Sequence, residues 1–290
     1  MSAAEALLGR VVDYAGLFPP AALDMATAVR QYQQYLQSED GWMLGSFVVP
    51  AARLEEFAAA FEQVCCGEKE SPWTLSIVCA GEGADDARRV AEFRQGAAFI
   101  GSLETKAADP RMAEEILERL PAARARYVEF SPQHAAEILP VLADRGARAK
   151  IRMGGVTPET IPDLEDVARF LTSCMRERVP FKATAGLHHA VRGPRALTGK
   201  PDSPRATMHG FLNLFLAAAL AYFGDEQQAI VGTLAEEDAS AFRGDDDVIR
   251  WHDHILITDQ VERVRSEFAM SFGSCSFTEP LDDMKEMGWI

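Results

Sequence analysis

The stretch RYVEFSPQHAAEILPVLADRGARAKIRM, residues 126–153, decides the fold. Two short runs rich in apolar and aromatic residues, 126–130 and 148–153, flank a segment with apolar residues at helical spacing, 135–145. Strands that alternate with helices of about 10 to 15 residues across short loops predict right-handed βαβ units with parallel strands.

The same alternation extends along most of the chain. Further strands are expected at 42–49, 73–79, 98–103 and 181–185, and further helices at 51–64, 84–94, 111–120 and 164–177. Strand starts recur about every 25 to 30 residues, the length of one strand, one helix and two short loops. No GxGxxG or GxxxxGK[ST] motif opens a helix, which argues against dinucleotide-binding and P-loop folds. The sequence therefore predicts an α/β fold, a single (β/α)8 barrel of the TIM type.

The predicted barrel is one domain of 290 residues. It divides into an N-terminal helical segment (1–41), the barrel (42–275) and an acidic tail (276–290) that packs across it.

The count of eight strands has two solutions. Residues 268–275 are expected to form the last strand, and 229–234 (AIVGTL) form either the seventh strand or a helical turn. In the second case residues 11–15 supply the missing strand at the front. Lys182 then lies on the seventh strand instead of the sixth.

The charge of the chain limits its partners. The formal net charge is -15 and the isoelectric point is about 4.9, which disfavours binding to nucleic acid or to an anionic membrane surface. The most apolar run, 211–223, is shorter than the roughly 20 residues of a membrane span and is expected to be a buried helix. A small anionic substrate is the expected partner, and self-association into a homo-oligomer stays open.

The cysteines and the N-terminus favour a cytoplasmic protein. Five cysteines, with no CxxC spacing, indicate reduced thiols instead of a disulfide framework or a zinc ribbon. The first residues lack a basic stretch ahead of an apolar one, so no signal peptide is predicted.

Charged side chains are predicted to face the barrel axis, because strand residues alternate between the axis and the helices. Ile151 and Met153 suit the helical layer, which turns Lys150 and Arg152 inward. The same alternation turns Lys182 inward. It also turns Glu129 inward on the strand 126–130, and Glu104 follows the end of the strand 98–103. The inward residues at the strand ends are Glu104, Glu129, Lys150, Arg152, Lys182 and Thr184. Barrel active sites lie at the carboxyl ends of the strands.

Such convergence of charge needs either internal ion pairs or a ligand. One interpretation is a structural ion-pair network in a non-catalytic barrel. The other is catalytic: neighbouring cations and burial favour the neutral amine of a lysine, which is then a nucleophile near neutral pH.

Residues 182–186 read KATAG, an inward lysine followed by small and hydroxyl residues and a glycine. This segment resembles the Schiff-base lysine segment of class I aldolases, notably the deoxyribose-phosphate aldolase type. The resemblance implies that Lys182 forms a carbinolamine with its substrate and that Lys150 or Arg152 lowers its pKa. The following LHHAVRG departs from that family.

The segments beyond the sixth and last predicted strands add further candidates. His188 and His189 begin a basic loop that includes Arg192, and Thr207 is expected to cap a helix with His209 in its first turn and Asn213 one turn later. Gly273 and Ser274 end the last strand, where barrels often hold an anion. Cys275 next to them is expected to be a small buried thiol. Residues 13–20 (DYAGLFPP) are expected to form a plug or a lid.

These residues predict an enzyme, a lyase or isomerase that acts on a small anionic carbonyl compound without a cofactor. Lys182 is its nucleophile or base, Glu129 the acid–base partner, Arg152 the anion clamp, and His188 or His189 a proton shuttle. The alternative is a hydrolase or isomerase dependent on a divalent metal, with His188 or His189, His209, and Glu104 or Glu129 as ligands. The non-catalytic barrel is the third hypothesis.

Overall fold

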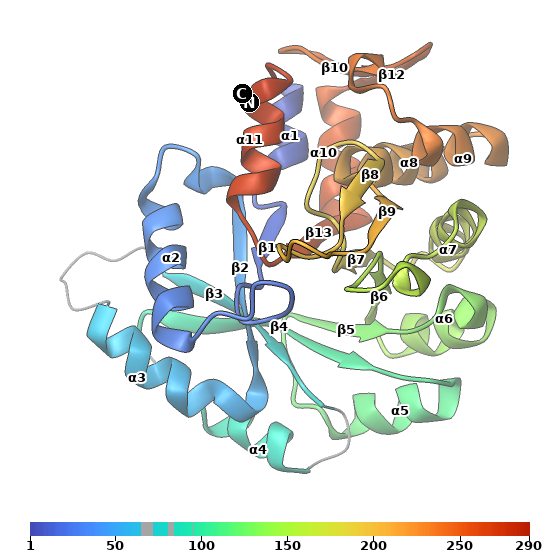
Figure 1. Cartoon of the computed structure of the whole chain (residues 1–290). Coiled ribbons are helices and arrows are strands. Elements are labelled where there is room, and N and C mark those ends of the chain that lie inside the picture. Colours follow the sequence, from blue (N-terminus) through green and yellow to red (C-terminus); the bar gives the residue numbers. More distant parts are fainter. Residues whose placement is uncertain (65–71, 81–83, 95) are drawn as a thin grey trace.

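The computed structural model describes residues 1–64, 72–80, 84–94 and 96–290. Eight parallel strands close into a barrel, in the order in which they follow one another along the chain (Figure 1). They are β1 (Val12–Tyr14), β2 (Leu44–Pro50), β3 (Trp73–Val78), β4 (Ala98–Lys106), β5 (Ala125–Glu129), β6 (Arg148–Arg152), β7 (Phe181–Thr184) and β13 (Ala269–Ser274). The predicted (β/α)8 barrel is confirmed.

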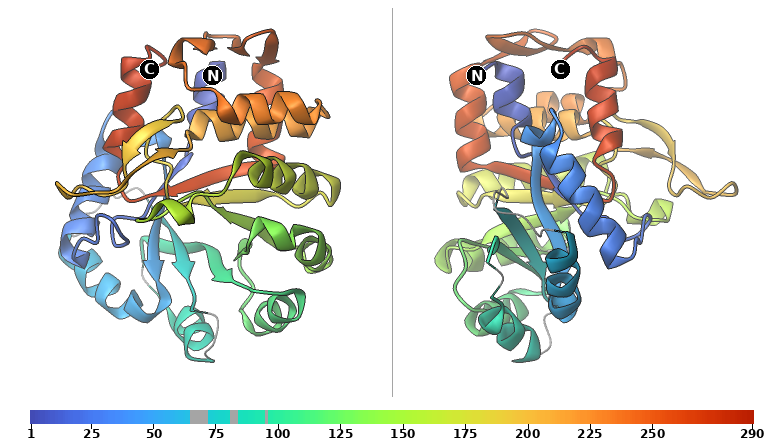
Figure 2. Two further views of the ribbon diagram at one scale, coloured as in Figure 1. Left: turned by 45° about the vertical axis from the view of Figure 1, so that its right-hand side comes forward. Right: turned by 90° about the vertical axis from the view of Figure 1, so that its left-hand side faces the viewer.

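Helices connect the strands and surround the barrel, as Figure 2 shows from two further sides. The first six follow β1 to β6 in turn: α2 (Met25–Gln37), α3 (Leu54–Val64), α4 (Ala84–Glu92), α5 (Pro110–Arg119), α6 (Ala135–Asp144) and α7 (Leu164–Arg176). Three of them begin with an aspartate whose carboxylate accepts a hydrogen bond from the helix backbone: Asp24, Asp109 and Asp163. Each of these caps satisfies a backbone N–H group that has no partner inside the helix.

The connection from β7 to β13 is much longer than the others. It contains a two-stranded sheet of β8 (Gly193–Ala196) and β9 (Arg205–Met208), the helices α8 (Phe211–Phe223), α9 (Gln227–Ala235) and α10 (Thr258–Glu267), and a three-stranded sheet of β10 (Phe242–Gly244), β11 (Val248–Trp251) and β12 (His254–Ile257). Helix α8 is apolar on all sides and buried along almost its whole length, as expected for a helix covered from every side. Within the described parts of the chain, no helix combines the length and the apolarity needed to cross a bilayer.

The front of the chain supplies the eighth strand. Residues 229–234 lie in α9, where the Thr233 hydroxyl donates to the Ala229 carbonyl one turn earlier. β1 pairs with both β2 and β13 and thereby closes the barrel. The barrel therefore begins at residue 12 and not at residue 42, and Lys182 lies on its seventh strand.

The two ends of the chain pack outside the barrel. Helix α1 (Ala3–Leu8) contacts α10, and α11 (Thr278–Glu286) occupies the predicted tail. Figures 1 and 2 show both helices, with α10 and the small sheet β10–β12, gathered on one side of the molecule.

The predicted cap of the apolar helix is wrong. Thr207 pairs with Pro194 in the hairpin of β8 and β9, and the helix begins at Phe211 with Gly210 as its N-cap. A Cβ atom on Gly210 would lie 2.4 Å from the Ala190 carbonyl oxygen, so the chain approaches too closely there for any other residue. His209 consequently precedes the helix.

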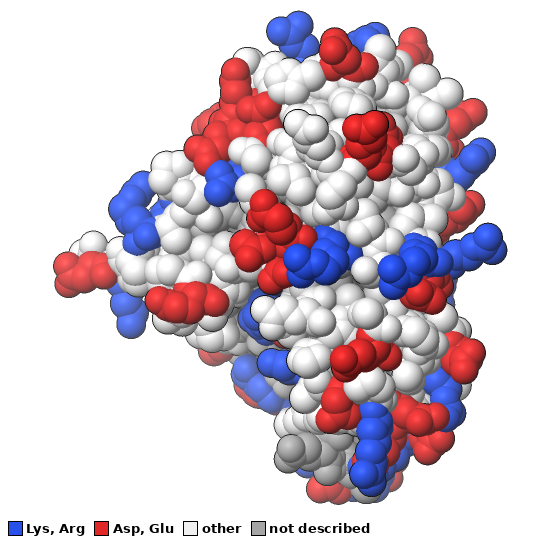
Figure 3. Space-filling view, turned by 90° about the vertical axis from the view of Figure 1, so that its right-hand side faces the viewer, with Lys and Arg blue, Asp and Glu red and all other residues white. Residues whose placement is uncertain are grey.

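The surface charges are mixed. On the face shown in Figure 3, acidic and basic side chains are interspersed, although the chain as a whole is acidic. This distribution is typical of a solvated surface.

The loops after β6 and β7 cross in direct contact. Gly186 has φ +72°, and a Cβ atom on it would lie 2.8 Å from Cα of Gly154. Gly146 also has positive φ, +57°, but a Cβ atom there would meet no atom within 4 Å. Substitution of Gly146 therefore tests backbone strain alone, whereas substitution of Gly186 tests strain together with steric contact.

Gly146→Ala is expected to lower the free energy of unfolding by about 1–2 kcal/mol, the strain of a left-handed alanine. Gly186→Ala adds overpacking of roughly 1–3 kcal/mol, because the three nearest atoms, Cα and N of Gly154 and the carbonyl oxygen of Met153, all belong to the backbone. Urea unfolding of the two variants measures the difference, and equal losses would contradict the close contact of the two loops.

Candidate active site

A cavity of about 460 Å³ lies at the carboxyl ends of the barrel strands. Its wall contains the five charged side chains that strand alternation predicted to face inward: Glu104, Glu129, Lys150, Arg152 and Lys182. Four of them are buried, whereas the Arg152 side chain is 48% exposed. The position is that of barrel active sites, and the volume is in the range of small-molecule sites.

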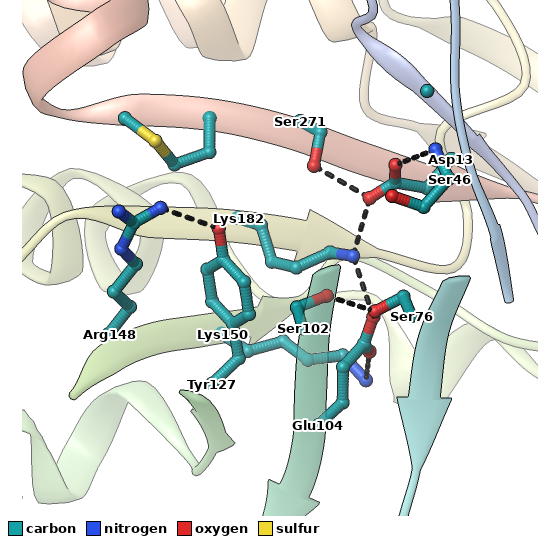
Figure 4. A network of polar contacts seen from close by, with 12 residues as sticks. Asp13, Ser46, Ser76, Ser102, Glu104, Tyr127, Arg148, Lys150, Lys182 and Ser271 are labelled. Carbon is teal, nitrogen blue, oxygen red and sulfur yellow. Dashed lines mark hydrogen bonds and ion pairs between the residues drawn. The ribbon is translucent and has the colours of Figure 1, made fainter. Parts of the chain in front are cut away.

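Lys182 is the most deeply buried of these residues, with 1% of its surface exposed. Its Nζ donates to Asp13 Oδ2 at 2.5 Å and to Glu104 Oε1 at 2.6 Å (Figure 4). The same nitrogen lies 5.4 Å from the centroid of the Tyr127 ring, a cation–π distance. These neighbours provide the pairing that a buried ammonium group requires.

Glu104 joins the two lysines. Its Oε2 atom lies 2.7 Å from Nζ of Lys150, and this nitrogen lies 3.1 Å from Glu129 Oε2. Glu129 in turn accepts a hydrogen bond from Arg152 Nε at 2.9 Å. Acids and bases thus alternate in an unbroken series that we call the charge chain: Asp13, Lys182, Glu104, Lys150, Glu129 and Arg152.

Strand register places the middle of the charge chain. Glu129 on β5 pairs with Lys150 on β6, and Lys150 pairs with Lys182 on β7. Parallel neighbours in register point to the same side of a sheet, so three charged side chains reach the barrel axis at one level. On the other side, Ile151 and Ala183 are fully buried, as the alternation predicted.

Asp13 is the member of the charge chain that the sequence analysis missed. It lies on β1, where its Oδ1 accepts from the Ser46 backbone N–H at 2.7 Å and its Oδ2 accepts from the Ser271 hydroxyl at 2.7 Å. The sequence feature that could have indicated it is a single acidic residue inside the short apolar run VVDYA, residues 11–15. These residues form the strand that the barrel needs if 229–234 are helical.

Two serines support Glu104, one on the neighbouring strand β3 and one on β4 itself. The Ser76 hydroxyl donates to Glu104 Oε1 at 2.5 Å, and Ser76 and Ser102 share a hydrogen bond of 2.6 Å (Figure 4). Ser102 is on β4 two residues before Glu104, hence on the same face of the strand. The carboxylate is therefore held by hydrogen bonds as well as by charge.

Burial and ion pairing oppose each other in this network. Burial lowers the pKa of Lys182, but the carboxylates of Asp13 and Glu104 outweigh it and raise that pKa above 10.5. Burial likewise raises the pKa of Glu104, but Lys150 and Lys182 bring it below 4.5; the pKa of Glu129 is also lowered, by Lys150 and Arg152. The expected depression of the Lys182 pKa is therefore wrong for this state, because Glu104 lies between the two lysines.

The outer part of the cavity carries unburied cations. Arg152 and Lys106, at the ends of β6 and β4, both line it and both are exposed. Thr184 and Gly273, predicted to bind substrate, line the same wall. Of the expected plug or lid, four residues line the cavity: Ala15, Phe18, Pro19 and Pro20.

The two adjacent histidines face different partners. His188 lines the cavity, and its Nδ1 lies 2.9 Å from Glu279 Oε2 on α11. His189 Nδ1 lies 3.1 Å from Asp283 Oδ2, on the same helix one turn later, and His189 is not part of the cavity wall. The acidic tail therefore holds the loop that follows β7.

Four predicted substrate-binding residues lie outside the cavity wall. Arg192 pairs with Glu237, and Asn213 accepts from the Arg192 backbone N–H and donates to the carbonyls of Thr233 and Glu236. The other two are placed as follows: His209 Nε2 lies 2.8 Å from the Pro162 carbonyl, and Ser274 Oγ lies 3.5 Å from His188 Nδ1. Asn213 and His209 thus hold neighbouring backbone segments together. The sequence alone does not distinguish this structural role from substrate binding.

The metal ligands proposed from the sequence do not converge. His209 is bonded to a backbone carbonyl away from the cavity, whereas His188 and Glu129 line it. Across residues 1–64, 72–80, 84–94 and 96–290, no group of three or more His, Cys, Asp or Glu side chains is arranged to hold a metal ion. Among the described residues, His188, His209 and Glu129 are therefore not brought together as one ligand set.

Comparison of the chain with protein-family models and with curated proteins finds no match.

Lys182→Met is expected to lower the free energy of unfolding by about 3–5 kcal/mol, because Asp13 and Glu104 lose a buried partner. Lys285→Met is the control, since its ion pair with Asp40 lies at the surface, where such pairs contribute little to stability. Chemical denaturation measures both. A Lys182 variant as stable as the Lys285 variant would contradict the geometry of the charge chain.

The depressed pKa of Glu104 predicts a loss of stability in acid. The stabilisation is present above the ordinary pKa of 4.5 and declines as the pH falls below it, because the unfolded chain then binds protons that folded Glu104 does not. Glu104→Gln is expected to be less stable at neutral pH but to show a shallower decline in acid. Denaturation at several pH values measures the slopes, with Glu286→Gln as the exposed control. Parallel slopes for all three proteins would refute this assignment.

Proposed function

We propose that this protein is an enzyme that acts on a small anionic carbonyl compound, with lysine ammonium groups assisting proton transfer. The observation that carries the proposal is the sharing of Glu104 by Lys150 and Lys182 in the wall of a cavity large enough for a small substrate. Ordinary barrel interiors are filled with branched apolar side chains. Two buried lysines in one cavity wall are a costly arrangement that carbonyl chemistry explains.

The anionic group of the substrate binds at the outer end of the cavity in this proposal. Arg152 and Lys106 are the exposed cations there, and the guanidinium group of Arg152 is fixed at Nε by Glu129. An arginine held in this way keeps further N–H donors for a carboxylate or a phosphate. The carbonyl group then extends inward, toward the lysines.

Glu129 and Lys150 are the proposed proton-transfer pair. Glu129 is an ionised carboxylate beside the cavity, because its pKa is lowered, and it is the acceptor for a proton from the carbon next to the carbonyl. Lys150 Nζ, 3.1 Å from Glu129, stabilises the enolate oxygen that develops. Lys182, paired with Asp13, helps keep Glu104 ionised, and Glu104 holds Lys150 in position. His188 is the remaining proton-transfer group of the wall.

The Schiff-base form of the proposal rests on the resemblance of residues 182–186 to class I aldolases. It requires a neutral amine at Lys182, whereas the raised pKa of Lys182 makes the ammonium group the resting form. Its proton has to pass to Asp13 or Glu104, both within hydrogen-bond distance, before the amine can add to a carbonyl carbon.

The complete pairing of the charge chain favours a second candidate function. Three acids and three bases alternate with every neighbour in contact, as in a network that only stabilises a barrel. In that case the cavity binds no carbonyl compound and the variants of the chain change stability alone.

Proton exchange at carbon distinguishes the two candidates. A panel of small keto acids and phosphorylated aldehydes and ketones in deuterated buffer is expected to include a compound that gains deuterium next to its carbonyl. Lys150→Met and Glu129→Gln are each expected to slow this exchange by about 100-fold or more, whereas the exposed control Lys200→Met leaves it unchanged. NMR follows the exchange, and circular dichroism checks the fold of each variant. No exchange with any compound by the folded protein would remove the catalytic proposal.

Borohydride reduction tests the Schiff-base form separately. Reduction in the presence of a compound that exchanges, followed by peptide mass analysis, is expected to leave an adduct on Lys182 if the amine adds to the carbonyl carbon. Deuterium exchange without any adduct assigns the reaction to proton transfer by the ammonium form instead.

A further inference from the structure

A second set of reactive side chains meets where two cavities join. An outer groove of about 570 Å³ shares five wall residues with the inner cavity: Pro20, His188, Leu197, Met208 and Cys275. Cys275 is partly exposed and follows β13 directly. Its thiol is therefore part of the wall of both spaces.

His188 connects this thiol to a carboxylate. Its Nε2 lies 4.0 Å from Cys275 Sγ, and its Nδ1 lies 2.9 Å from Glu279 Oε2. The Ser274 hydroxyl lies 3.5 Å from the same Nδ1. One ring nitrogen thus faces the thiol while the opposite nitrogen is fixed by an acid, which is the order of nucleophile, base and orienting group in thiol enzymes.

We propose that Cys275, His188 and Glu279 form a nucleophilic thiol site for small acyl compounds, esters or thioesters, that enter from the outer groove. This activity goes beyond the proposed carbonyl chemistry, because it uses none of the charge chain. Glu279 holds the imidazole so that Nε2 exchanges a proton with Sγ.

The reaction balances without any further reagent. The Cys275 proton moves to His188 Nε2, and the sulfur forms a bond to the acyl carbon as the bond from that carbon to the leaving oxygen or sulfur breaks. His188 returns the proton to the leaving group. Water then attacks the thioester, which releases a carboxylic acid and restores the thiol.

The charge state of His188 supports this arrangement. Burial lowers its pKa, but the hydrogen bonds with Cys275 and Glu279 outweigh burial and raise the pKa to about 9. An imidazole with a raised pKa is a stronger acceptor for the Cys275 proton, and the imidazolium that it becomes lies between the sulfur and Glu279. Reactive cysteines are found in partly exposed places beside such a cation.

The neighbouring histidine provides a matched control. His189 is likewise an imidazole bonded to a carboxylate, that of Asp283, but it lines only the outer groove. The other cysteines that the structure describes, Cys79 and Cys174, are buried. Cys65 and Cys66 lie outside the described residues and are replaced by serine in every protein tested.

The test uses p-nitrophenyl acetate as the acyl probe and iodoacetamide as the alkylating probe, at neutral pH. We expect a burst of nitrophenolate with one acetyl group on Cys275, and a fall of about 100-fold in both reaction rates for His188→Gln but not for His189→Gln. Glu279→Gln is expected to give a smaller fall, because the ring loses its orientation but keeps its nitrogen. Stopped-flow absorbance and peptide mass analysis provide the rates and the modified residue.

Three results would overturn the proposal: equal rates for the two histidine variants, acetylation at lysine without Cys275, or a wild-type thiol no faster than free glutathione. The comparison with glutathione needs no variant, so it stays decisive if His188→Gln does not fold. Neither probe is a substrate for proton exchange at carbon, so failure of the thiol site and failure of the carbonyl proposal are distinguished.

Discussion

The bridge that Glu104 makes between Lys150 and Lys182 is the interaction on which the rest of the site depends. One carboxylate accepts from two buried ammonium groups, one at each oxygen, at 2.7 and 2.6 Å. A charge in so dry a place is tolerated only when it is paired and hydrogen-bonded. Asp13 and Glu129 complete the pairing at either side, and the hydroxyl of Ser76 supports the carboxylate from the next strand. The positions of β1, β3, β4, β5, β6 and β7 are therefore linked through one set of contacts.

This linkage joins charged side chains that three neighbouring strands carry at one level of the barrel interior. The register of β5, β6 and β7 places Glu129, Lys150 and Lys182 side by side, while the residues between them turn to the helices and are apolar. The network closes the inner part of the cavity and leaves its outer part to Arg152 and Lys106, whose charges reach solvent. The cations of the cavity wall thus pass from buried to solvent-exposed, and the proposed binding of an anionic substrate relies on this arrangement.

The long connection between β7 and β13 gives this barrel its second chemical feature. Its first residues carry His188 and His189, and α11, after the last strand, supplies Glu279 and Asp283 to hold them. The thiol of Cys275 meets His188 because the strand that precedes α11 ends beside the strand that precedes the histidines. Residues 188, 275 and 279 are thus brought together by the pairing of β13 with β7, and the acidic tail is a part of the site.

Strand and helix periodicity determined the barrel, most strand positions and the inward direction of Lys150, Arg152 and Lys182, because the alternation of apolar residues reports directly which face of a strand is buried. Sequence alone left open whether residues 11–15 or 229–234 complete the barrel, since a three-residue strand and a short apolar helix give equally weak patterns. Only the tertiary structure decided the partners: Asp13 at Lys182, Glu104 between the lysines, and Glu279 and Cys275 at His188. Closure of the barrel makes these contacts between residues 46 to 169 positions apart in the chain, and the sign of a pKa shift depends on which charge is nearest. That is why the raised pKa of Lys182 followed from the fold and not from the residues beside it.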